Sequence, residues 1–431
     1  MSEIYHANQV VNADPRLSKL KDYLVDAVAP QMQDQSRMKL PDRDSVRHLL
    51  LDVYARIQAD LKPEVRDRIL DFALADLVGY GPVDALLPDP EISEIMINGA
   101  KHVFVERNGE LLETDVQFKD DDHLLRIIDR IVSPLGRRVD SDNPTADARL
   151  PDGSRVNVVI PPVAVDGPHV TIRKFLQTKM SMDDLVTMEA LTPYMAKFLE
   201  ACVVTRLNIL VTGNTSSGKT TVLNALSGFI PEKERIVTIE DAVELKLKQR
   251  HVVRLETKLP NVDGSGAVGV RELVRNALRM RPDRIVVGEV RGGEAMDMLQ
   301  AMNTGHTGSI TTLHANSPRD GTSRLETMSM MAGLEMPLLA IRKQIAAAIN
   351  LIVHLSRLPD GSRKMTHITE LSGMEGDVIT LTDIFKFEQT GVTPEGKIIG
   401  QLRPTNMRPL FSPRLEAAGY KLGGEIFGAG L

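Results

Sequence analysis

The sequence has no tryptophan, one cysteine, and aromatic residues at only 4% of its 431 positions. A single cysteine excludes an intramolecular disulfide and a metal site built from several thiolates, and it fits a reducing compartment. Cys202 lies in an apolar helical run, so we expect it to pack in a core. The scarcity of aromatics leaves little for stacking the bases of single-stranded nucleic acid.

The chain also lacks an excess of positive charge and any long hydrophobic run. Its formal net charge is −6, so neither nucleic acid nor anionic lipid is attracted to it overall. The start of the sequence has no basic region and apolar core of the kind that forms a signal peptide. No run approaches the ~20 apolar residues that cross a membrane. We therefore expect a cytoplasmic protein that does not bind nucleic acid directly.

The first half of the chain predicts two different domains. Apolar residues at helical spacing in three successive stretches indicate a helical bundle over residues 1–82. Residues 88–176 contain an amphipathic helix and short alternating runs, two of which flank the hairpin signal Asn108-Gly109, so we expect a compact α+β domain there. Residues 177–189 have the composition of a linker.

From about residue 190 strands alternate with helices, which predicts a mostly parallel sheet covered on both faces. The fold class is therefore α/β, with a doubly wound sheet over residues 190–405 and a tail over 406–431. The expected strands are LNILVTG, ERIVTIED, HVVRLET, RIVVGEV, SITTLHA and LIVHLSR.

The segment GNTSSGKTT, between an apolar strand and a helical run, fits the phosphate-loop pattern GxxxxGK[ST]. Its glycines allow backbone N–H groups to face phosphate oxygens, and the helix that follows adds a partial positive charge. Lys219 would neutralise the β- and γ-phosphates, and Thr220 would bind Mg²⁺. The predicted nucleotide-binding residues are Gly213, Asn214, Thr215, Ser216, Ser217, Gly218, Lys219, Thr220 and Thr221.

Ligands of open α/β sheets lie beyond the carboxyl ends of the strands, so the residues at those ends are the candidates for chemistry. Glu240, followed by Asp241, is the candidate carboxylate for activating water. Glu289 is the candidate for holding Mg²⁺ through water, or for sharing with Glu240 the role of positioning the attacking water. His314 would donate a hydrogen bond to the γ-phosphate.

Each of these candidates also has a purely structural interpretation. Glu289 could begin a helix, and His314 could be a histidine whose hydrogen bonds are satisfied at a strand end. Gly288 stands where many strands of this kind carry a metal-binding aspartate, which leaves open a protein that binds nucleotide without turnover. The role of His306, in a glycine-flanked loop, stays undetermined.

The cation for the far side of the γ-phosphate is absent from these segments. In ring-shaped NTPases an arginine from another domain or subunit supplies it. Arg155 and Arg173, and with less support Arg149, lie at turns or strand ends of the α+β domain and are the candidates.

Four segments in order resemble the boxes of the secretion ATPase superfamily, which powers type II and type IV secretion and type IV pilus assembly. They are GNTSSGKTT, TIEDAVEL, RIVVGEVRGGEA and TGHTGSITTLHANSP. The segments ISEIMINGAKHVFVERNGEL and ARLPDGSRVNVVIPPVAVDGPHVTIRKF resemble most the CpaF branch, whose members drive tight-adherence pili. Many pilus extension ATPases carry a zinc site of four cysteines. This chain has one cysteine and cannot form that site, which suits the CpaF branch.

The resemblance, over roughly residues 60–390, implies a RecA-like ATPase domain with ATP and Mg²⁺ bound between two lobes of a homohexamer. It carries the phosphate-loop role to Lys219 and Thr220, the acidic box to Glu240, the Gly-Glu box to Glu289, the histidine box to His306 and His314, and first-lobe arginines to Arg155 and Arg173.

The function implied is a motor at the inner face of the bacterial inner membrane that assembles tight-adherence pili through membrane platform proteins, with retraction of the pili by the same motor left open. Export of protein or DNA by a type IV or type II secretion system is the alternative. The N-terminal bundle is a candidate docking element for partners.

Overall fold

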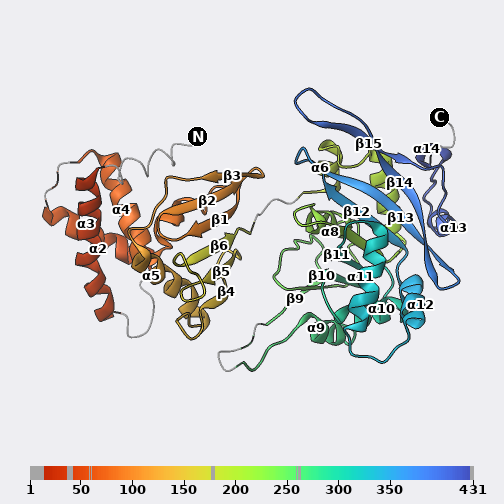
Figure 1. Cartoon of the computed structure of the whole chain (residues 1–431), viewed down its shortest axis with the longest axis horizontal. Coiled ribbons are helices and arrows are strands. Elements are labelled where there is room, and N and C mark those ends of the chain that lie inside the picture. The colour runs from red at the N-terminus through yellow and green to blue at the C-terminus, as the bar shows by residue number, and fades with distance from the viewer. Residues whose placement is uncertain are drawn as a thin grey trace. The chain divides into compact units, whose positions relative to one another are not determined.

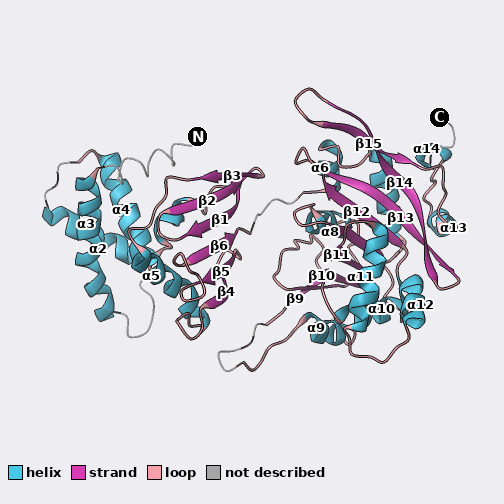
Figure 2. Cartoon of the chain, in the orientation of Figure 1, coloured by secondary structure: helices cyan, strands magenta, loops and turns pink. Residues whose placement is uncertain are grey.

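The computed structural model describes residues 14–35, 42–57, 59, 61–175, 180–258, 260 and 264–427. The chain forms two compact units, Met1–Gln177 and Thr178–Leu431. Figures 1 and 2 show the elements of each unit.

The first unit opens with the three predicted amphipathic helices, which pack around a core of leucine, isoleucine and valine. The last of them begins at Pro63, where a fixed φ and a missing N–H suit the first helical position. Their bounds are α2 Pro15–Gln35, α3 Arg43–Ile57 and α4 Pro63–Val78, followed by the short 3-10 helix η1 Gly81–Ala85.

The rest of the first unit is a six-stranded antiparallel sheet in the order β3-β2-β1-β6-β5-β4, with α5 packed on it. Asn108 and Gly109 have φ of 53° and 85°, so they form the tight turn of the predicted hairpin. The bounds are β1 Ile92–Asn98, β2 His102–Arg107, β3 Glu110–Glu113, α5 Asp121–Val132, η2 Ser133–Leu135, β4 Thr145–Arg149, β5 Arg155–Val159 and β6 His169–Arg173.

The second unit is built on a nine-stranded sheet in the order β15-β14-β13-β12-β7-β11-β10-β8-β9. The strands from β12 to β9 in this order run parallel, and the remaining ladders are antiparallel. The strand bounds are β7 Ile209–Gly213, β8 Ile236–Glu240, β9 Val252–Glu256, β10 Arg284–Val290, β11 Ile310–His314, β12 Leu351–Arg357, β13 Arg363–Glu375, β14 Val378–Val392 and β15 Ile398–Pro404.

Helices cover both faces of this sheet. The bounds are α6 Met182–Thr187, α7 Pro193–Val204, α8 Lys219–Ser227, α9 Val270–Ala277, α10 Glu294–Asn303, α11 Pro318–Met330, α12 Leu338–Ala348, α13 Ser412–Ala417 and α14 Gly424–Phe427. Ile209 and Val211 pack with α6, α7 and α8, whereas Leu210 between them packs with α10, α11 and α12 on the other face. This alternation within a fully buried strand explains the continuous apolar run of the sequence.

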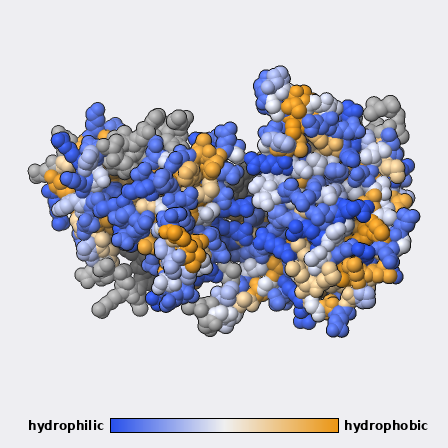
Figure 3. All heavy atoms as spheres, viewed as in Figure 1, coloured by the Kyte–Doolittle hydropathy of each residue, from blue (hydrophilic) through white to orange (hydrophobic). Residues whose placement is uncertain are grey.

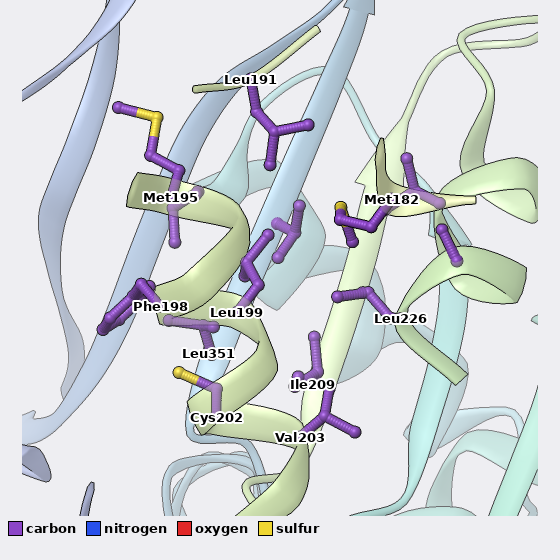
Figure 4. Close-up of a cluster of buried hydrophobic side chains, with 14 of the residues drawn as sticks. Met182, Leu191, Met195, Phe198, Leu199, Cys202, Val203, Ile209, Leu226 and Leu351 are labelled. Carbon is purple, nitrogen blue, oxygen red and sulfur yellow. The ribbon is translucent and has the colours of Figure 1, made fainter. Parts of the chain in front are cut away.

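Cys202 lies in α7 and is fully buried in the first of these two cores, as predicted (Figure 4). Burial raises the pKa of its thiol well above the usual range. The thiol is therefore protonated and shielded from solvent, which fits a packing residue.

The six predicted strands are confirmed, but the sheet is larger than the sequence suggested. Three strands, β13 to β15, extend it in antiparallel fashion beyond β12. Part of the stretch interpreted as a linker is the helix α6, whose Met182 (Figure 4) enters the core of the second unit together with Leu185. Residues 176–179 lie outside the described part of the chain. The proposed domain boundaries stay predictions.

Within the described residues, no helix is long and apolar enough to cross a membrane. The face drawn in Figure 3 is largely hydrophilic, with apolar residues in separate areas. Single exposed apolar side chains such as Val165 and Leu410 are ordinary for a protein surface.

Candidate nucleotide site

The predicted phosphate loop connects β7 to α8. A Cβ on Gly213 would lie 2.5 Å from both the Leu355 carbonyl oxygen and the Ser217 hydroxyl, so only glycine fits at that position. Gly218 has a φ of 96°, in the left-handed region that side chains avoid. The two glycines of the motif are thus explained by a close approach at the first and a backbone turn at the second.

Lys219 is buried at the start of α8, and its Nζ donates to the Asn214 carbonyl oxygen at 2.9 Å. Its Nζ also lies 3.3 Å from Nδ1 of His314, at the end of β11. The Ser217 hydroxyl is buried and has no hydrogen-bond partner within the described residues. Asn214, Thr215 and Ser216 are exposed, whereas Thr220 and Thr221 are half-buried. The loop therefore presents polar groups that a phosphate could engage.

A chain of charged side chains continues from His314 along the carboxyl edge of the sheet. Nε2 of His314 lies 2.8 Å from Oε1 of Glu289, near the end of β10. The other Glu289 oxygen accepts from Arg291 Nε at 2.7 Å, and Arg291 Nη1 lies 3.2 Å from Oδ2 of Asp241, just after β8. Burial lowers the pKa of His314, although Glu289 opposes that shift. Three parallel strands thus deliver one connected set of charges to the phosphate loop.

Glu240, the last residue of β8, is in a different situation. Its side chain is only 3% exposed, and Oε2 accepts from the backbone N–H groups of Glu244 at 2.7 Å and Leu245 at 2.9 Å. Oε1 is buried and has no hydrogen-bond partner among the described residues. Burial raises the pKa of this carboxyl to about 7. Glu240 is therefore close to half-protonated at neutral pH.

The structure gives a reason for Gly288 in place of an aspartate. Val287 lies beside Ile239 in the parallel ladder, which places Gly288 next to Glu240. A Cβ on Gly288 would lie 3.0 Å from Cγ of Glu240, closer than most side-chain contacts. A side chain here would crowd the buried acid, so the glycine makes room for Glu240.

His306 is not brought into this network. Within the described part of the chain, its hydrogen bonds are made by its backbone, with Ala301 and Ser309. Its Nδ1 is buried there without a hydrogen-bond partner. Its predicted place in the histidine box is therefore not matched by a contact with the charged residues at the sheet edge.

The three candidate arginines of the first unit form one row. Arg149 lies opposite Arg155 in the β4–β5 ladder, and Arg155 lies opposite Arg173 in the β5–β6 ladder. Directly opposite residues of antiparallel strands share a face and lie close together. The sequence indicated each arginine separately, and the antiparallel register groups them into a concentration of positive charge.

Sequence reasoning missed Arg291, which links two of the predicted carboxylates. A signal was present in GEVR, because residues two apart near the end of a strand point to the same face. It also missed His354 of β12, whose Nδ1 lies 2.8 Å from the Thr212 hydroxyl beside the phosphate loop. Burial lowers the pKa of His354 to about 4, so it is neutral at pH 7. Its position depends on strand order, which no local pattern reveals.

The described residues contain no group of three or more acidic, histidine or cysteine side chains that could hold a metal ion by themselves. Mg²⁺ in nucleotide sites needs only one or two protein ligands, since phosphates and water supply the rest. Thr220 follows Lys219 in the first turn of α8, and the unpartnered Oε1 of Glu240 suits a metal-bound water. The residues present therefore fit an ion that arrives with the nucleotide.

Comparison with known proteins gives a consistent result. Residues 76–387 match the model of the family described as "Type II/IV secretion system protein". A putative conjugal transfer protein of Mycobacterium tuberculosis is 37% identical over 313 residues, which cover 71% of this chain and 88% of the relative. The conjugal transfer protein TrbB of Rhizobium radiobacter is 32% identical over 294 residues, covering 67% and 86%. Among solved structures, the VirB11 ATPase of Brucella suis is 30% identical, with 67% of this chain and 95% of that chain covered and a TM-score of 0.38.

Proposed function

The chain belongs to the type II/IV secretion system protein family, and on that premise we propose that it is the ATP-driven motor of a type IV-type secretion machine. It is an NTP-hydrolysing enzyme of that family. The observation that carries the proposal is the connected set of charges at the carboxyl edge of β7, β11, β10 and β8. It contains the phosphate-loop lysine, a histidine, a carboxylate and an arginine.

Each residue of the set has a role in phosphoryl transfer to water. Lys219 would bind the β- and γ-phosphates of ATP, while Thr220 and a water on Glu240 would hold Mg²⁺, which would neutralise the developing charge. His314 lies between Lys219 and Glu289, so a γ-phosphate bound by Lys219 would also be within reach of His314.

We assign the activation of water to Glu289 rather than to Glu240. Glu289 is ion-paired, its side chain is 16% exposed, and it lies within reach of the phosphate loop through His314. Glu240 is buried and keeps one oxygen on two backbone N–H groups. Glu240 would then orient the water shell of Mg²⁺ through its unpartnered oxygen. This division reverses the assignment that the sequence suggested.

The remaining cation would come from the arginine row of the first unit. Arg155 and Arg173 lie opposite each other, so they would offer two guanidinium groups to one γ-phosphate. An arginine supplied from another domain or subunit favours a ring, and we propose a homohexamer at the inner face of the bacterial inner membrane, held there by membrane partners.

The cargo is the finer question. The relatives reported above are named for conjugal transfer and type IV secretion, which favours export of protein or DNA. They are not named for tight-adherence pili, the branch that the sequence motifs resemble. A pilus motor is the second candidate, because the net charge of −6 and the few aromatics disfavour direct handling of DNA.

Two measurements test this proposal. Purified full-length protein should release phosphate from Mg²⁺-ATP, and Lys219→Ala should abolish this while the exposed control Lys233→Ala should not. In cells lacking the gene, export of protein or DNA and surface pili should be scored separately after complementation. Loss of export with normal pili supports the secretion motor. Loss of pili alone supports the second candidate, and no loss of either overturns both.

A further inference from the structure

Arg363, the first residue of β13, lies against the outer side of the phosphate loop. Its Nε donates to the Ser216 carbonyl oxygen at 3.0 Å. Its Cδ lies 3.9 Å from the place that a Cβ on Gly218 would occupy, so the side chain extends over the turn of the loop. Within the described residues the guanidinium makes no ion pair, and no sequence motif pointed to it.

Two neighbours in the sheet fix the position of Arg363: β7, through β12, and β15, through the turn before β13. β12 pairs with β7, with Leu355 opposite Gly213, so the β12–β13 hairpin begins beside the phosphate loop. At its turn, Asp360 accepts from the Ser362 N–H at 3.0 Å and from the Ile398 N–H of β15 at 2.8 Å. A strand that lies beyond the matched family region thus anchors the hairpin that carries Arg363.

Ser216 needs such a partner. Its φ is 57°, in the left-handed region, where a residue other than glycine is disfavoured. For the N–H groups of a phosphate loop to face inward, carbonyl groups must face outward and find donors there. A charged guanidinium is among the stronger hydrogen-bond donors that an outward-facing carbonyl group can find.

The hydrogen bond also acts on the next residue. The Ser216 carbonyl belongs to the same peptide group as the Ser217 N–H, which now donates to the Asn214 carbonyl at 3.3 Å. A cation at the oxygen end polarises that group and makes its N–H a better donor. The Asn214 carbonyl also accepts from Lys219 Nζ. The Asn214 carbonyl therefore holds two phosphate-binding groups, the Ser217 N–H and the Lys219 ammonium, in place.

We propose that Arg363 is a positioning residue for nucleotide binding: it holds the phosphate loop in the form that accepts phosphate, and β15 sets its position through Asp360. The inference rests on the proposed nucleotide site. It predicts an effect on affinity, since Arg363 acts on the loop and not on the water that attacks.

The test is ATP binding and turnover by the full chain with Arg363→Gln, Arg363→Lys and Asp360→Asn. Arg363→Gln should raise the Kd and the KM for ATP roughly tenfold, the loss of one charge-assisted hydrogen bond, with kcat within about twofold of wild type. Arg363→Lys should recover part of the affinity. Asp360→Asn should give a smaller rise, because it only loosens the hairpin.

The matched control is Lys364→Gln, which removes the neighbouring positive charge. Lys364 Nζ donates to the Glu189 carbonyl at 2.8 Å, away from the loop, so ATP affinity should stay at the wild-type value. Equal affinities for wild type, Arg363→Gln and Arg363→Lys overturn the inference, as does an equal loss in Lys364→Gln. If Arg363→Gln does not fold, unchanged affinity in Arg363→Lys and Asp360→Asn overturns it. A wild type that binds no ATP would defeat the proposed function itself.

Discussion

Two neighbouring strands of the second unit each end in a glutamate, and the two carboxyl groups are held in opposite ways. Glu240 of β8 is 3% exposed and meets backbone N–H groups on one oxygen only. Glu289 of β10 lies between the imidazole of His314 and the guanidinium of Arg291. Burial favours the neutral acid at Glu240, whereas Glu289 is less buried and is in contact with Arg291 and His314.

The contrast shows that residue type at a strand end does not fix its chemistry. A shift of one position along β10, from Gly288 to Glu289, moves the side chain out of the crowded space beside Glu240 and into reach of Arg291 and His314. Two acids in different surroundings, on neighbouring strands, can divide metal positioning and water activation between them. The following predictions test whether the two are different in function as well.

The largest effect should follow from Glu289→Gln. Removing this carboxyl group should lower kcat for ATP hydrolysis by roughly 100- to 1000-fold, the usual contribution of a general base, with ATP binding retained. Steady-state phosphate release and a separate binding titration measure the two. A variant with near wild-type kcat would return the role of base to Glu240.

A second prediction concerns Glu240→Gln and pH. The pKa of Glu240 is higher in the folded chain, about 7, than its usual 4.5, so the folded state binds this proton more tightly. The resulting stability is fully present below pH 4.5 and is lost as pH rises through 7. Since glutamine does not titrate, Glu240→Gln should gain about 2–3 kcal/mol relative to wild type between pH 5 and pH 8.

Denaturant unfolding at the two pH values measures this gain. The matched control is Glu375→Gln, an exposed glutamate of the same sheet, for which the difference between the two pH values should be close to zero. An equal response of the two variants would remove the distinction drawn for Glu240.

How much of this contrast the sequence could predict depends on the residue. The strands β7 to β12 were predictable, because continuous apolar runs end in polar residues, and so was the position of Lys219, Glu289 and His314 close together at one edge of the sheet. The reason for Gly288 was not, since it depends on the register between β8 and β10. No local pattern predicts that two glutamates will differ in burial.

The missed strands β13 to β15 have a similar explanation. Their ladders contain several register irregularities, including one near Gly373 and one near Gly391, which interrupt the alternation that marks a strand. Arg363 was missed with them, because its contact with Ser216 joins residues 147 positions apart.

A third and smaller effect is expected for Gly288→Ala. The added Cβ would meet Glu240 Cγ at 3.0 Å, so the acid or the strand must shift, at a cost of about 1–2 kcal/mol in stability. Because the clash is with Glu240, the double variant Glu240→Ala/Gly288→Ala should recover most of that cost. Thermal unfolding of wild type, the two single variants and the double variant measures this recovery, and purely additive losses would contradict the contact.

The smallest effect is expected for Arg291→Gln. Arg291 holds Glu289 and Asp241 from a largely exposed position, so its loss should cost only about 1 kcal/mol, or a fivefold fall in kcat. Raising the salt concentration should reduce the difference from wild type. A fall as large as that of Glu289→Gln would show that Arg291 itself contacts the reacting groups.

The single cysteine has a practical consequence. Because Cys202 is fully buried and its thiol stays protonated, thiol-reactive dyes should leave the native chain unlabelled. Any cysteine introduced at an exposed loop would then be the one reactive site, with no need to remove native thiols first. Glu395, at the exposed turn between β14 and β15, offers such a position for attaching a fluorophore. The chain is thus suited as it stands to single-molecule observation of its working cycle.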